Sequence, residues 1–64
     1  MWTVVYVAQD EQETFNIKEV LENNKIISRT RKRISAPEET MCFEIMVPSQ
    51  ELALAQDLII ASQM

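Results

Sequence analysis

The chain has 64 residues, of which 47% are hydrophobic and 25% charged, with a formal net charge of −4 at pH 7. It contains no glycine, no histidine and one cysteine, which excludes a glycine-rich phosphate loop, an internal disulfide, a zinc site of histidine and cysteine ligands and a histidine general base. We therefore expect one small domain over residues 1–64 that is not an enzyme and uses no metal or cofactor.

The size of the chain makes self-association an expected source of stability. A domain this small buries only about 60% of the surface that its unfolded chain exposes, and neither a disulfide nor a metal can supplement its core. No apolar run approaches the ~18 residues of a membrane helix, and Met1 leads into a strand without the basic region of a signal peptide. We expect a cytoplasmic homo-oligomer, with a dimer favoured and no membrane contact.

The first predicted elements are a strand and a helix. Residues 2–8, WTVVYVA, are rich in β-branched and aromatic residues and apolar on both faces, which is typical of a strand covered on two sides. Asp10 and Glu13 have the spacing of a capping box and predict a helix from Asp10 to about Asn23. The residues expected on its inner face are Thr14, Ile17, Val20, Leu21 and Asn24.

The helix is predicted to end at Asn23 and Asn24, because asparagine is second only to glycine in accepting the left-handed conformation of a helix end. A second strand follows over residues 26–34. Its arginines are expected to face outward, since burying them would leave a row of unpaired charges. The opposite, inward face would carry Ile26, Ser28, Thr30, Lys32 and Ile34.

The rest of the chain predicts a loop, a strand and a helix. Residues 35–40, SAPEET, form a polar loop that closes a hairpin. The third strand, residues 42–47, has two unlike faces and ends at Pro48. Ser49 is the expected N-cap of a helix over residues 49–62. The inner face of this helix would carry Leu52, Ala55, Leu58, Ile59 and Ser62.

This order of elements predicts an α+β domain with a β-α-β-β-α arrangement. We expect a three-stranded antiparallel sheet in the order 1-3-2, with both helices on one face. Val5, Val7, Phe43, Ile45 and Val47 would then face the helices. The uncovered face is the predicted self-association surface, and it would carry Trp2, Val4, Tyr6, Cys42 and Met46. Strand one would also have a free edge open to pairing.

Three stretches, WTVVYVAQD, VLENNKII and FEIMVPSQELALAQDLI, resemble a family of small bacterial proteins described as signal-transducing. That family is similar to the ferredoxin-like domain of PII-type nitrogen regulators. The resemblance spans nearly the whole chain and implies a ferredoxin-like fold and a regulatory or adaptor-type binding module. The chain departs from the family at Lys25, where the family usually has glycine, and we expect this to alter the helix cap but not the fold.

The candidate binding residues are Arg29, Arg31 and Arg33, which alternate on one face of the second strand at about 7 Å per step. Such a ladder suits an acidic protein partner or a small anion. Its alternatives are a solvated edge strand protected by charge and a nucleic-acid surface. Nucleic acid is disfavoured by the net charge of −4. Pairing of the arginines with the acidic first helix would also explain them.

Two further residues have open interpretations. Cys42 is either a small packed side chain or the nucleophile of a thiol-dependent enzyme, and the second role needs a cationic neighbour that lowers the thiol pKa. Phe15 lies opposite the inner face of the first helix. It is either a surface aromatic lying over its neighbours or a partner contact.

Overall fold

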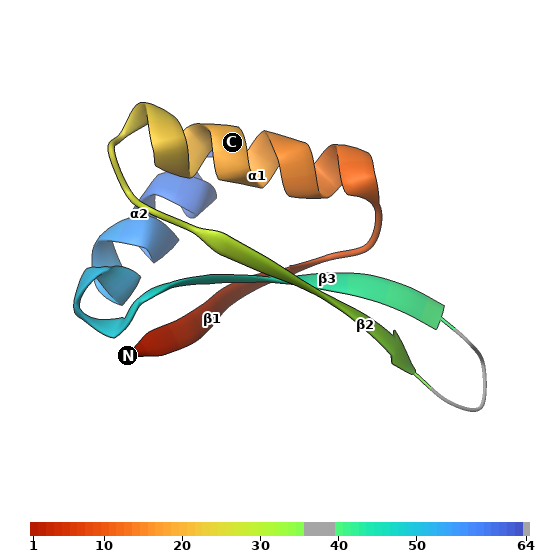
Figure 1. Cartoon of the computed structure of the whole chain (residues 1–64). Coiled ribbons are helices and arrows are strands. Elements are labelled where there is room, and N and C mark those ends of the chain that lie inside the picture. Colours follow the sequence, from red (N-terminus) through yellow and green to blue (C-terminus); the bar gives the residue numbers. More distant parts are fainter. Residues whose placement is uncertain (36–39, 64) are drawn as a thin grey trace.

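The computed structural model describes residues 1–35 and 40–63. Its elements are β1 (Trp2–Ala8), α1 (Glu11–Asn23), β2 (Arg29–Ser35), β3 (Thr40–Pro48), a 3-10 turn (Ser49–Glu51) and α2 (Leu52–Ser62). The strands form one antiparallel sheet in the order β1-β3-β2. Figure 1 shows both helices on the same side of this sheet. The predicted β-α-β-β-α, ferredoxin-like α+β arrangement is therefore confirmed.

The hydrophobic core lies between β3 and the two helices. Ile45 and Val47 of β3 are completely buried, and Phe43 packs against the same cluster. The inner faces predicted for both helices are largely confirmed, although Asn24 and Ser62 are exposed. The remaining core residues are Ala8, Ile17, Leu21, Ile26, Ala55 and Ile59.

A β-bulge in β1 changes which side chains face the helices. Val4 pairs with Met46, but the next pair is Tyr6 with Ile45, so Val5 is the extra residue. Beyond the bulge Tyr6 lies on the helix side, where its hydroxyl donates a 3.0 Å hydrogen bond to Glu13 of α1. Val7 lies on the opposite side. The predicted placements of Tyr6 and Val7 were therefore wrong, because the alternation does not continue through a bulge.

Both ends of α1 have the predicted kind of cap, but a different residue forms the C-terminal one. Asp10 is the N-cap and its carboxylate accepts from the Glu13 N–H at 2.7 Å, as predicted. At the other end Lys25, and neither asparagine, has the left-handed conformation (φ 62°). The Lys25 N–H donates to Glu22 and the Ile26 N–H to Leu21, each at 2.9 Å, which is a Schellman motif.

The start of α2 differs from the prediction. The Ser49 side chain does not cap the helix, which begins at Leu52 after the 3-10 turn. The Ser49 hydroxyl contacts the Thr3 hydroxyl and donates to the Met1 carbonyl at 3.1 Å. The Ser49 N–H donates to the same carbonyl at 2.8 Å. Ser49 therefore holds the beginning of β1 against the end of β3.

The second strand begins later than predicted, at Arg29, and its inner face is only partly covered. Ile26 is buried, but Thr30, Lys32 and Ile34 are exposed because β2 is an edge strand that extends beyond the helices. The centre of the predicted loop, residues 36–39, lies outside the described residues.

Candidate interaction surface on the open face of the sheet

One face of the sheet is not covered by either helix, and we call it the open face (Figure 1). The register of the strands determines its composition, because residues paired across antiparallel strands point to the same side. Its residues are Trp2, Val4 and Val7 of β1, Cys42, Glu44 and Met46 of β3, and Arg29, Arg31 and Arg33 of β2. All three arginines of the predicted ladder thus share this face.

Arg31 and Arg33 bind the same carboxylate. Nε and a terminal nitrogen of Arg31 lie 2.9 and 2.6 Å from one oxygen of Glu44, and Arg33 lies 3.1 Å from the other oxygen. The carboxylate comes from β3, so the proposed pairing of these two arginines with α1 is not what the structure shows. The Glu44 side chain is 13% exposed, whereas those of Arg31 and Arg33 are 56% and 59% exposed. One carboxylate is therefore shared between two well-exposed cations.

This arrangement changes the acidity of Glu44. The hydrogen bond from Arg31 lowers the pKa of the Glu44 carboxyl below its ordinary value of 4.5. Partial burial acts in the opposite direction, and the hydrogen bond from Arg33 and the charges of both arginines lower the pKa further. Glu44 therefore stays ionised to a lower pH than an ordinary glutamate, and its carboxylate holds both guanidinium groups.

Arg29 has a different partner. Its guanidinium carbon lies 4.4 Å from the centre of the Trp2 ring, within the range of a cation–π interaction. This contact joins β2 to β1 across the open face, and it covers part of the Trp2 ring. The arginine ladder is therefore divided: Arg29 packs on an aromatic ring, whereas Arg31 and Arg33 form a charged pair.

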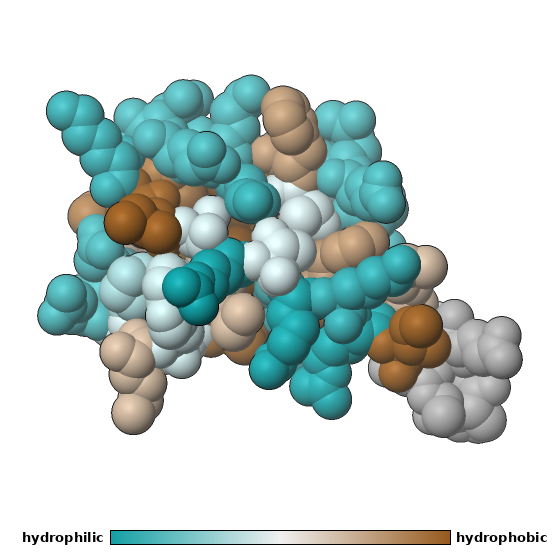
Figure 2. Space-filling model, in the orientation of Figure 1, coloured by the Kyte–Doolittle hydropathy of each residue, from teal (hydrophilic) through white to brown (hydrophobic). Residues whose placement is uncertain are grey.

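The apolar part of the open face lies on β1 and β3. Val4 and Val7 are exposed, with Val7 at 45%, and Trp2, Cys42 and Met46 are half-buried. Four of the five residues predicted for self-association are thus together on this face, and Tyr6 is not. Figure 2 shows hydrophilic side chains gathered over β2 and over the outer side of α1, with some hydrophobic side chains between them.

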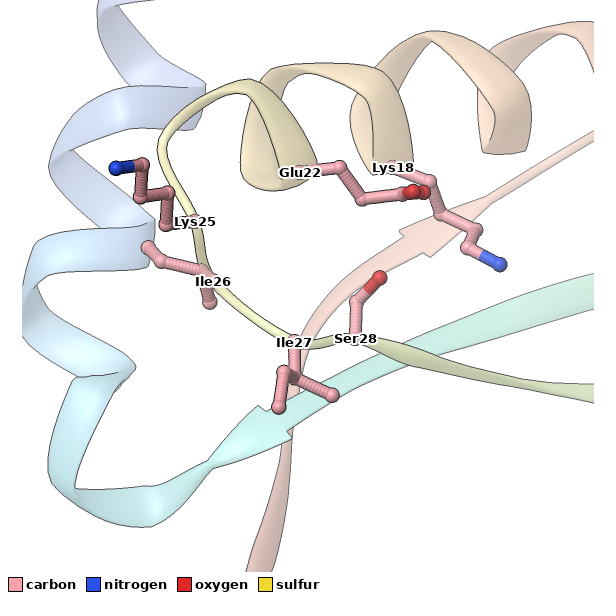
Figure 3. A pocket seen from close by; sticks show the side chains of 6 residues that line it. All are labelled: Lys18, Glu22, Lys25, Ile26, Ile27 and Ser28. Atoms are coloured by element: carbon pink, nitrogen blue, oxygen red, sulfur yellow. The ribbon is translucent and has the colours of Figure 1, made fainter.

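The connection between α1 and β2 has a shallow hollow, which is shown in Figure 3. It contains Lys18, Lys25 and Ser28, a combination that would suit an anion. The two lysine side chains extend in opposite directions, however, and the Glu22 carboxylate lies beside Lys18 (Figure 3). The Ser28 hydroxyl is buried and has no hydrogen-bond partner among the described residues. This hollow does not form a convergent binding site.

Three further observations on the described residues concern Phe15, membrane-spanning helices and metal-binding clusters. Phe15 is exposed on α1, which is required both of a surface aromatic that lies over its neighbours and of a partner contact. The described helices are too short or too polar for a bilayer span. No group of three or more histidine, cysteine, aspartate or glutamate residues with metal-binding geometry occurs in residues 1–35 and 40–63.

Glu44 is the important site residue that the sequence reasoning did not identify. A usable signal was present, because a hairpin closing on Ser35 and Thr40 also fixes the pairs farther along the strands. Arg31 lies four residues before Ser35 and Glu44 four residues after Thr40, so the two residues are paired. A hairpin that closes symmetrically about the predicted loop therefore places Glu44 opposite Arg31.

The chain was compared with protein-family models, curated proteins and solved structures, and none of the three comparisons finds a match.

Proposed function

We propose that this chain is a small regulatory binding module that captures an acidic segment of a protein partner on its open face. The observation that supports this most strongly is the sharing of Glu44 by Arg31 and Arg33. Two positive charges meet one negative charge there, so the cluster retains a positive charge. An arginine side chain has five N–H donors, and Glu44 uses only some of those available on this pair.

The surroundings of the two arginines favour an extended protein segment as the ligand. Carboxylates of a partner would bind the exposed donors of Arg31 and Arg33, and apolar side chains would cover Val4 and Met46. Trp2, with Arg29 stacked on it, borders the apolar part. Charge at one side and apolar surface at the other would orient the partner.

The resemblance to small signal-transducing proteins supports the same type of function, because it implies a regulatory or adaptor-type binding module. Two alternatives are less well supported. Nucleic acid would be repelled by the net charge of −4. Cys42 lies on the open face opposite Arg33, but the chain contains no histidine to serve as a base.

The proposal is tested by capture of partners from a native lysate with the immobilised protein. Replacing Arg31 and Arg33 together with glutamine should abolish capture, and raising the salt concentration to about 0.5 M should weaken capture by the wild type. Lys32→Gln is the control, because Lys32 lies between them in sequence but faces the other side of the sheet.

The results of this experiment distinguish a protein partner from a small anion as the ligand of the arginine pair. Capture that is lost in the double variant and retained in Lys32→Gln supports the proposal. Equal capture by all three proteins would rule out the arginine pair as the binding site. If phosphate binds the wild type and no protein is captured, the same arginines serve a small anion instead.

A further inference from the structure

The two edges of the sheet differ in how they resist pairing with another strand. β2 forms one edge and carries four cations in seven residues, including Arg29, Lys32 and Arg33. Charged residues on an edge strand oppose its pairing with a second copy of itself. β1 forms the other edge and has no charged residue between Trp2 and Ala8. The described structure thus protects one edge by charge and leaves the other without it.

The backbone of β1 presents hydrogen-bonding groups at this free edge. The N–H of Ser49, the residue that follows β3, donates to the Met1 carbonyl, so this carbonyl points toward β3. Because successive residues of an antiparallel strand alternate in direction, the N–H and C=O groups of Trp2 and Val4 point away from β3. Pro48, which pairs with Trp2, has no N–H, so it cannot donate to the Trp2 carbonyl, which is consistent with that carbonyl pointing away from β3. The bulge at Val5 ends this regular stretch.

A partly apolar groove lies beside β1. It has a volume of about 400 Å³ and is lined by residues of β1 and α2 and by Gln63, but by none of β3. Gln56, Asp57 and Gln63 supply its polar lining. Its aliphatic lining residues are Val5, Ile59 and Ile60. Ile60 is 61% exposed, so its side chain is available for contact with a second molecule.

We propose that two copies of the chain pair edge to edge through residues 2–4 of β1, antiparallel about a twofold axis at Thr3. Trp2 of each copy then pairs with Val4 of the other and satisfies the outward-pointing backbone groups. Met1 follows next and lies opposite Val5 of the other copy. The side chain of Met1, which is fully exposed in one copy, would face the helix side and enter the groove beneath Ile60.

Charge favours this dimer over one formed by stacking the open faces. Stacking would bring together the three arginines and the single glutamate of each copy, a large excess of like charge. Edge pairing keeps the arginines at the two far ends of one continuous sheet. An isologous β1 pair also closes on itself and leaves only the charged β2 edges exposed, so it does not propagate into a fibre.

The dimer is tested first by light scattering and sedimentation of the wild type and two pairs of variants. Val4→Pro removes an edge N–H and should give a monomer, whereas Val4→Thr keeps that N–H and should remain dimeric. Ile60→Gln should weaken dimerisation by about tenfold or more. Leu54→Gln alters another exposed aliphatic residue of α2, at 53% against 61% for Ile60, outside the groove and should have no effect.

Two measurements on the wild type keep the test independent of the folding of Val4→Pro. The amide protons of Trp2 and Val4 should be protected from exchange in concentrated solution and lose this protection on dilution. The Cys42 thiol, which lies on the open face, should react equally fast in dimer and monomer.

A wild type that stays monomeric up to about 1 mM would overturn the proposal. So would a dimer in which the Cys42 thiol is protected and these amides are not, since that pattern indicates stacked open faces. Protection of the two amides only when a different protein is added would assign the edge to that protein instead.

Discussion

Arg31 places two nitrogens on one oxygen of Glu44, at 2.9 and 2.6 Å, although the two residues are 13 positions apart in the chain. The pair joins the charged edge strand to the central strand on the face that the helices do not cover. Glu44 therefore fixes the direction of the arginine side chains from which we infer the binding function. Its protonation should disrupt this arrangement.

The first prediction is that Glu44 contributes to the acid sensitivity of the fold. The pKa of Glu44 is lower in the folded protein than the ordinary value of 4.5, so the unfolded chain takes up the proton at a higher pH. The stabilisation is complete above pH 4.5 and is lost as the pH falls through the lowered value. The free energy of unfolding of Glu44→Gln, measured with urea, should therefore fall less steeply in this range.

The matching control is Glu19→Gln, which removes the same charge from an exposed position on α1. Its acid profile should follow that of the wild type. If Glu44→Gln also has the wild-type profile, the two arginines do not stabilise the carboxylate in solution.

The second prediction concerns the end of α1. Lys25 has φ 62°, a conformation that costs a residue with a side chain roughly 1 kcal/mol and costs glycine much less. Lys25→Gly should raise the free energy of unfolding by about 1 kcal/mol and the Tm by roughly 4–8 °C. Asn24→Gly is the control, because Asn24 has φ −104° and gains nothing from glycine. Thermal unfolding that ranks the two variants in the opposite order would contradict the cap assignment.

The third prediction concerns the buried hydroxyl of Ser28, which has no hydrogen-bond partner among the described residues. Its removal in Ser28→Ala should leave stability unchanged or raise it by up to about 1 kcal/mol. Ser49→Ala makes the same chemical change where the hydroxyl donates to the Met1 carbonyl, and should lower stability by about 1 kcal/mol. The free energies of unfolding of the two variants are measured with urea. A marked loss of stability in Ser28→Ala would reveal a bound water or another partner of the hydroxyl.

The sequence was sufficient to predict the element order and the sheet topology because β3 and α1 have clear periodic patterns. Phe43, Ile45 and Val47 alternate with less apolar neighbours, and this contrast identified the buried central strand. In β1 the contrast is absent, since residues on both faces are apolar. The bulge at Val5 therefore left no trace in the pattern, and the positions of Tyr6 and Val7 were exchanged.

The other errors have a common physical cause, which is that local rules do not include distant contacts. Ser49 has the chemistry of a helix cap, but Met1 and Thr3 compete for its hydroxyl from the other end of the chain. At the end of α1, burial of Ile26 beside Leu21 fixes the chain direction and places Lys25 at the left-handed position. In both cases tertiary packing determined the local structure.

The central claim, that Arg31 and Arg33 form an acidic-segment binding site, is tested most directly by NMR titration with an oligoglutamate peptide. The peptide should shift the Nε–Hε signals of Arg31 and Arg33 in proportion to its binding, and the shifts should diminish at about 0.5 M salt. The Lys32 signals should move little, because its side chain lies on the other face of the sheet. Arginine signals that remain unmoved, or shifts concentrated around Lys18 and Lys25, would show that the open face is not the binding surface.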